Sequence, residues 1–176
     1  MQDIRLTNIS FIVLGLLSWA KRATPYDLKQ MAASLTDLWS VQHTQLYGEP
    51  ARLAKAGYVT EEQEATGRRR KTYELTDKGR RALEQWKAAP TDTFTELRDP
   101  GLLKLYFGAD PSAVAADQLK LHRRRLAEYE ELAAQAPKGA PAGPLLTLQA
   151  GLGHEREWVR FWESQTPGQA RRSRAR

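Results

Sequence analysis

Residues 67–71 read Gly-Arg-Arg-Arg-Lys, which places four cations within five positions. Guanidinium and ammonium groups at this density bind phosphates, and such contacts give affinity for nucleic acid that depends on salt and not on base sequence. The competing interpretation is a solvated turn, because most charge runs simply face water. The elements around the run decide between the two.

Two extended segments flank the run. Tyr58-Val59-Thr60 and residues 71–75 are rich in β-branched and aromatic side chains, and the polar stretch between them is centred on Gly67. This pattern predicts a two-stranded hairpin whose tip, or the residues just past it, carries Arg68, Arg69, Arg70 and Lys71. A further helix follows, with Thr76 as its N-cap and Trp86 on its inward face.

Three helices are predicted before the hairpin. Residues 9–20 form an apolar helix, a second helix is capped by Thr24, and a third starts near Gln42 or His43 and ends at Gly57. Three helices followed by a hairpin is the order of a winged helix-turn-helix, in which the third helix enters the major groove and the hairpin follows the backbone. In that context phosphate contact is the favoured interpretation of the cationic run.

The third helix has a proline in its middle. Pro50 has no N–H to bond to the carbonyl of Leu46, and its ring collides with the preceding turn. It lies four residues after Leu46 and three before Leu53, so it belongs to the buried face. We expect the helix to be kinked or loosened between residues 46 and 50.

The opposite face of the third helix is polar. Threonine and glutamine near a helix N-terminus reach base edges, whereas arginine and lysine further along suit phosphates. An ordinary solvent-facing surface would have a similar composition. The residues predicted to be exposed on this face are His43, Thr44, Gln45, Gly48, Glu49, Arg52 and Lys55.

The C-terminal half is predicted to be helical. Residues 88–93 (Ala-Ala-Pro-Thr-Asp-Thr) are the expected boundary, and a short helix ending at Gly108 follows them. A long helix then has apolar and histidine positions spaced alternately by four and three, at Ala115, Leu119, His122, Leu126, Tyr129 and Ala133. A linker at 136–143 precedes a last helix from about Pro144 to Glu163. The predicted domains are 1–88 (winged helix-turn-helix), 94–164 (helical) and 165–176 (a basic, disordered tail).

The composition limits the possible functions. There is no cysteine, so disulfides, thiolate metal sites and cysteine nucleophiles are excluded. The three histidines, His43, His122 and His154, have no histidine or cysteine at ligand spacing, and neither a glycine-rich phosphate loop nor a nucleophile–base signature is present. We therefore predict no enzyme activity, no catalytic residue, no metal and no cofactor. The longest apolar run, residues 9–20, is shorter than the ~20 residues of a membrane span.

The net charge of +6 is concentrated at the C-terminus. Arg171, Arg172, Arg174 and Arg176 supply four positive charges in the last six residues, so the rest of the chain is nearly balanced. A disordered basic end touches polyanions without specificity. A claim of DNA binding must therefore depend on where the folded body places its charges.

Five tryptophans are many for a chain of this length. Core or dimer packing is the stronger interpretation of most of them. An aromatic surface that holds a flat hydrophobic effector is the alternative, and its candidate residues are Trp39, Trp158 and Trp162.

Three stretches resemble the PadR family of transcriptional regulators over residues 9–88. They are FIVLGLLSWAKRATPYDLKQMA, HTQLYGEPARLAKAGYV and GRRRKTYELTDKGRRALEQW, and their most specific parts are Leu46-Tyr47, Arg52-Leu53 and the Tyr-x-Leu-Thr-x-x-Gly motif at 73–79. The C-terminal half resembles the longer branch with a helical dimerisation domain. The implied fold class is mainly α with a small β-hairpin.

The resemblance implies a homodimer that binds double-stranded DNA at a pseudo-palindromic operator and represses, until a small aromatic or hydrophobic compound relieves repression. It adds Tyr47 to the candidates. The predicted DNA-binding residues are then Gln42, His43, Thr44, Gln45, Tyr47, Arg52, Lys55, Arg68, Arg69, Arg70 and Lys71. We expect a cytoplasmic protein. The alternative is a winged-helix adaptor that uses the same fold for protein contacts and has no operator.

Overall fold

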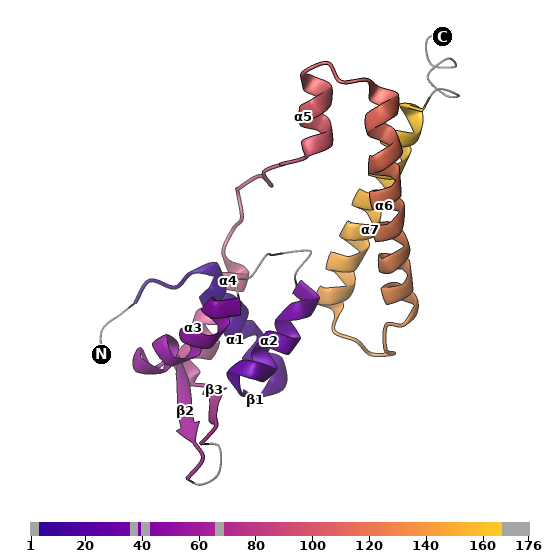
Figure 1. The fold of residues 1–176 in the computed structure, drawn as a ribbon. Coiled ribbons are helices and arrows are strands. Elements are labelled where there is room, and N and C mark those ends of the chain that lie inside the picture. The colour runs from indigo at the N-terminus through magenta and orange to yellow at the C-terminus, as the bar shows by residue number, and fades with distance from the viewer. Residues whose placement is uncertain (1–3, 36–38, 40–42, 66–68, 167–176) are drawn as a thin grey trace. The chain divides into compact units, whose positions relative to one another are not determined.

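A computed structural model describes residues 4–35, 39, 43–65 and 69–166. The chain divides into two compact units, residues 1–93 and 94–176. The N-terminal unit combines helices with a small sheet, and the C-terminal unit is helical (Figure 1). The mainly helical fold with a winged helix-turn-helix at its N-terminus is confirmed.

The N-terminal unit is built around the apolar helix α1. Its elements in chain order are α1 (Asn8–Ala20), β1 (Arg22–Ala23), α2 (Pro25–Ala32), the 3-10 helix η1 (Ala33–Leu35), α3 (His43–Lys55), β2 (Val59–Gln63), β3 (Lys71–Leu75) and α4 (Asp77–Ala88). Val13, Leu14 and Leu17 of α1 are buried against Leu28 of α2 and Leu53 of α3. Burial of these side chains drives the unit to fold and fixes the position of α3.

The sheet has three antiparallel strands in the order β1-β3-β2. In the hairpin, Val59 pairs with Leu75 and Gln63 with Lys71, while Arg22 of β1 pairs with Glu74. The sequence predicted the hairpin but not β1, because two residues between helices carry no strand periodicity. Figure 1 shows the hairpin extending beyond the helices.

The start of α4 packs closely against the backbone at the start of the hairpin. Thr76 caps α4 as predicted and also donates its hydroxyl to the carbonyls of Gly57 and Tyr58, at 2.8 and 2.9 Å. A Cβ at Gly79 would lie 2.1 Å from the Tyr58 carbonyl oxygen, so only glycine fits there. Trp86 was predicted to face inward, but it is 46% exposed and stacks on Phe11 of α1 with ring centroids 4.8 Å apart.

Helix α3 is continuous from His43 to Lys55 in spite of Pro50. The pyrrolidine ring is fully buried on the same face as Leu46 and Leu53, as predicted from the spacing. The helix ends where Gly57 takes a φ of 78°, a left-handed conformation that glycine adopts without steric cost.

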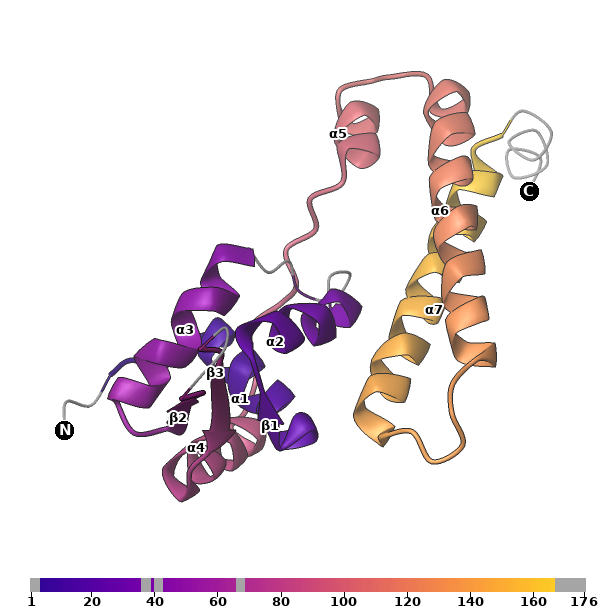
Figure 2. The same ribbon diagram turned by 60° about the horizontal axis from the view of Figure 1, so that its bottom comes forward.

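The C-terminal unit contains α5 (Pro100–Tyr106), α6 (Pro111–Ala134) and α7 (Ala142–Ser164). Figures 1 and 2 show α6 and α7 running side by side. Ala115, Leu119 and Trp162 form the buried core, and a Cβ at Gly151 would lie 2.8 Å from the Tyr129 ring. The predicted seam thus faces α7, except that Ala133 at its end is exposed. In the described part of the chain, no helix combines the length and the apolar character that a membrane span requires.

Candidate nucleic-acid interface

Helix α3 presents a short polar surface near its N-terminus. Thr44, Gln45, Tyr47 and Gly48 are exposed, and the Tyr47 side chain is 48% accessible. His43 is the first residue of the helix, whereas Gln42 lies outside the described residues. The buried positions Leu46, Pro50 and Leu53 orient this surface away from the core.

The second half of α3 is tied to α1 by a polar cluster. The Glu49 side chain is only 11% exposed, which corrects its predicted place on the solvent face. Ser10, fully buried in α1, donates its hydroxyl to Glu49 Oε1 at 2.6 Å. Arg52 donates from Nε to Glu49 Oε2 at 2.8 Å and from Nη2 to Oε1 at 2.6 Å.

The Arg52 guanidinium is therefore engaged inside the unit. It also donates to Ser10 Oγ at 3.0 Å and to the Arg5 carbonyl at 3.4 Å. The hydrogen bonds that Arg52 donates to Glu49, together with the charge of that carboxylate, raise the pKa of Arg52 above its ordinary value. These contacts make Arg52 a connector between α3 and the residues around the start of α1, and sequence spacing gave no sign of this role.

The wing is the hairpin formed by β2, β3 and the turn between them. Arg69 has a φ of 49°, and Arg69, Arg70 and Lys71 are exposed; Arg68 lies outside the described residues. Lys71 Nζ lies 2.6 Å from Glu61 Oε1. The Tyr73 hydroxyl donates to Glu61 Oε2 at 2.8 Å, and burial together with this carboxylate raises the pKa of Tyr73 to about 12.

A second ion pair lies on the other side of the sheet. Arg22 of β1 pairs with the Glu62 carboxylate and donates from Nε to Thr72 Oγ1 at 3.0 Å. Residues 59–75 hold four cations and four glutamates, so the wing as a whole is electrically neutral. The cationic run considered alone did not reveal this balance.

A cleft of about 510 Å³ joins α2, α3 and the wing. It is lined by Thr24, Pro25, Tyr26, Asp27, Tyr47, Arg70 and Lys71. The Asp27 carboxylate accepts hydrogen bonds from the Thr24 backbone N–H and hydroxyl, which, with a smaller contribution from the charge of Arg70, hold its pKa below the ordinary value. Three of the predicted DNA-binding residues thus meet at one cleft. Tyr26, 58% exposed, was not among the predictions.

The C-terminal unit holds an aromatic cluster. Trp158 stacks on His122 and donates its indole N–H to His154 Nε2 at 2.6 Å. Glu155 is buried and lies 2.6 Å from His122 Nδ1. Trp162 is fully buried beside Trp158, so of the three predicted effector-binding tryptophans only Trp39 and Trp158 have accessible surface.

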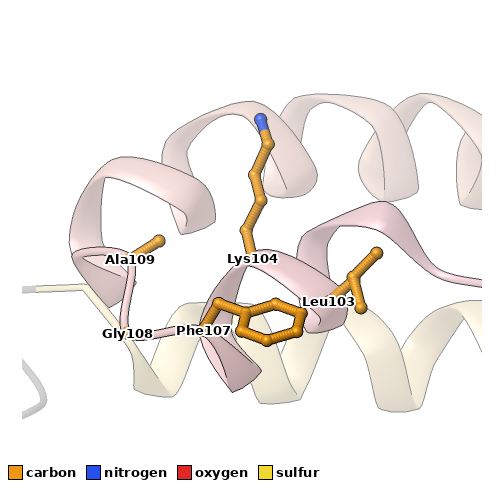
Figure 3. Close-up of a pocket in the computed structure, with 5 residues that line it drawn as sticks. All are labelled: Leu103, Lys104, Phe107, Gly108 and Ala109. Atoms are coloured by element: carbon orange, nitrogen blue, oxygen red, sulfur yellow. The ribbon is translucent and has the colours of Figure 1, made fainter.

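A hollow of about 480 Å³ lies at the C-terminal end of α5. Figure 3 shows the Phe107 ring beside Leu103, with the Lys104 side chain extending away from both. Leu103 is 59% and Phe107 78% exposed. Within the described part of the chain, this end of α5 is therefore an apolar surface that is exposed over most of its area.

Both units match known families. Residues 13–85 match the family described as "Transcriptional regulator PadR-like family", and residues 97–165 match "Virulence activator alpha C-term". Among curated proteins, the chain is 28% identical over 172 residues to the negative transcriptional regulator PadR of Bacillus subtilis (strain 168), covering 89% of this chain and 94% of that protein.

Solved structures of two relatives are similar over nearly the whole chain. B. subtilis PadR in complex with operator DNA matches with a TM-score of 0.77 at 28% identity, over 90% of this chain and 97% of that one. The same protein in complex with p-coumaric acid matches with a TM-score of 0.73 at 28% identity, over 89% of this chain and 95% of that one. The Vibrio cholerae virulence activator AphA matches with a TM-score of 0.69 at 26% identity, over 96% of this chain and 100% of that one.

Proposed function

This chain belongs to the PadR-like family of transcriptional regulators, a family of DNA-binding proteins and not of enzymes, and we propose on that premise that it is a homodimeric repressor of a pseudo-palindromic operator. The observation that carries the proposal is the cleft at which Tyr47 of α3 meets Arg70 and Lys71 of the wing. A recognition helix and a phosphate-binding loop on one surface are what a winged helix-turn-helix needs to read a groove and hold the backbone beside it.

Within this interface, α3 supplies the base contacts. Thr44 and Gln45 are exposed near its N-terminus, where hydroxyl and amide groups reach base edges. Tyr47, Arg69, Arg70 and Lys71 hold phosphates, and Lys55 at the end of α3 contributes charge. Gln42, His43 and Arg68 complete the proposed set. Arg52 acts through its contacts with Glu49 and Ser10, by holding α3 in place.

The C-terminal unit, with residues 94–164, is the proposed dimerisation domain. Its support is the apolar surface that residues 94–107 expose: Phe94 is 98%, Tyr106 84% and Phe107 78% accessible. A monomeric protein rarely leaves a group of large apolar side chains exposed to water. A dimer places two α3 helices about 34–36 Å apart, one turn of DNA, to match two half-sites.

A small aromatic or hydrophobic effector is proposed to relieve repression. The support is B. subtilis PadR, which has been solved both with operator DNA and with p-coumaric acid. Trp39 in the N-terminal unit and Trp158 in the C-terminal unit have accessible surface, and each is proposed as a separate candidate for contact with such a compound. Acting on operator DNA, the protein works in the cytoplasm, and residues 165–176 add a basic tail.

Selection of random DNA by the purified protein, followed by sequencing, tests the function. The proposal expects an enriched motif with two-fold symmetry whose half-sites lie one helical turn apart. Enrichment of no motif would favour the alternative, a winged-helix adaptor that binds proteins. Repression rather than activation is tested with a reporter gene placed behind the selected motif.

A further inference from the structure

Glu61 occupies the junction between the recognition helix and the wing. Its two carboxylate oxygens are bound by different residues of β3, Lys71 at 2.6 Å and the Tyr73 hydroxyl at 2.8 Å. The hydrogen bonds from Lys71 and Tyr73, and to a smaller extent the charge of Lys55 at the end of α3, hold the pKa of Glu61 below its ordinary value. The carboxylate is therefore ionised wherever the protein meets DNA.

Two of the proposed phosphate-binding cations thus share one counter-charge. Lys71 lines the cleft and lies 2.6 Å from Glu61, and the charge of Lys55 on α3 acts on the same carboxylate. A phosphate that approaches Lys71 meets a negative charge 2.6 Å from the ammonium nitrogen. The attraction that a lone lysine would exert is correspondingly reduced.

The exposure of the pair bears on how it behaves when DNA arrives. The Lys71 side chain is 45% and the Glu61 side chain 28% exposed. Ion pairs this accessible contribute little to stability, so Lys71 exchanges Glu61 for a phosphate at little cost. The carboxylate, however, stays in place because Tyr73 also holds it, and its repulsion of the phosphate remains.

We propose that Glu61 acts as an electrostatic brake, which lowers the affinity of this protein for DNA of every sequence. The proposal rests on the proposed function, since it supposes that the cleft faces the DNA backbone. A neutral wing limits the affinity that does not depend on base sequence. A repressor built this way keeps its operator complex dissociable while α3 retains the choice of sequence.

The test is Glu61→Gln, which removes the charge and keeps an oxygen that accepts the Tyr73 hydroxyl. Affinity is measured for the selected operator and for a random duplex over a series of salt concentrations, with a melting curve to verify folding. The brake predicts a several-fold gain on both duplexes. It also predicts a salt slope steeper by about 0.9, because one more phosphate is neutralised. The ratio of the two affinities stays unchanged within twofold.

Glu84→Gln is the matched control, because Glu84 pairs with Lys87 within α4 and the substitution alters net charge by the same amount. An equal effect of Glu61→Gln and Glu84→Gln would overturn the proposal. So would a change confined to the operator, which would indicate that Glu61 positions α3 instead. If the native chain binds no operator, the proposed function fails; if it binds and Glu61→Gln changes nothing, only the brake fails.

A double substitution provides a second test. Lys71→Gln lowers DNA affinity by a larger factor in the Glu61→Gln background than in the native chain. In the Glu61→Gln background the ammonium group of Lys71 has lost the carboxylate of Glu61. Equal factors in the two backgrounds would mean that Glu61 does not restrain Lys71, and would also overturn the proposal.

Discussion

The guanidinium of Arg52 lies side-on against the carboxylate of Glu49, one turn earlier in α3, with both charge-assisted hydrogen bonds shorter than 3 Å. Ser10 of α1 donates to the same carboxylate, so the pair joins the recognition helix to the core helix. Three polar side chains with mutual partners in a half-buried position fix one orientation, since any other leaves a buried group unsatisfied.

Arg52→Ala is expected to lower the free energy of unfolding by about 1–2 kcal/mol, because Glu49 and Ser10 lose a charged partner while Arg52 itself is partly exposed. Because Arg52 orients α3, operator affinity should fall more than affinity for random DNA. Chemical denaturation and binding to the two duplexes check both effects. An equal loss on both duplexes, with a flatter salt dependence, would instead indicate that Arg52 contacts a phosphate.

Gly79→Ala is expected to destabilise the N-terminal unit by about 1–3 kcal/mol, because the new methyl group overlaps backbone that has little room to move. A Cβ there would lie 2.1 Å from the Tyr58 carbonyl oxygen. Gly15→Ala in α1 is the control, since among the described residues no atom beyond its own stretch of helix lies within 4 Å of its Cβ position. That control should stabilise by up to about 1 kcal/mol through helix propensity. Thermal unfolding of the two variants distinguishes close packing from propensity.

Substitution of Arg69 and Arg70 together by alanine is expected to weaken binding to all sequences alike. Each lost phosphate contact reduces the salt slope by about 0.9, so the pair should reduce it by nearly two units. Titrations of operator and random duplexes over a range of salt provide the measurement. Operator affinity that survived the double substitution unaltered would remove the wing from the interface.

The sequence predicted the elements of the fold better than the contacts within the site. The starts of α2 and α4 were predictable from Thr24, Pro25 and Thr76. The capping hydrogen bonds of threonine and the fixed φ of proline depend only on neighbours in sequence. The partners of Glu49 and Arg22 lie 39 and 40 residues away, and no local pattern encodes a pairing at that distance. For the same reason the cationic run indicated a charged wing but not its ion pairs, in which Glu61 and Glu62 of β2 bind Lys71 and Arg22.

The pH dependence of stability at high pH should report on Tyr73. Its pKa is raised to about 12 by burial and by Glu61, above the ordinary value of 10.0. A raised phenol pKa means that the folded state favours the protonated form. The corresponding stability is complete below pH ~10 and is lost as the pH rises through about 12. Tyr73→Phe should remove this loss, which denaturation at a series of pH values and the absorbance of the phenolate both measure.

The apolar end of α5 should be required for the dimer. Leu103 and Phe107 expose most of their surface at one hollow, and aspartate at both positions would place two charges in a contact from which water is excluded. Leu103→Asp with Phe107→Asp is expected to give a monomer by light scattering and to weaken operator binding, because each half-site is then bound singly. Lys104→Asp, on the same turn but with a side chain that extends away from Leu103 and Phe107, should remain dimeric. A dimer that persisted in the double aspartate variant would place the interface elsewhere on the chain.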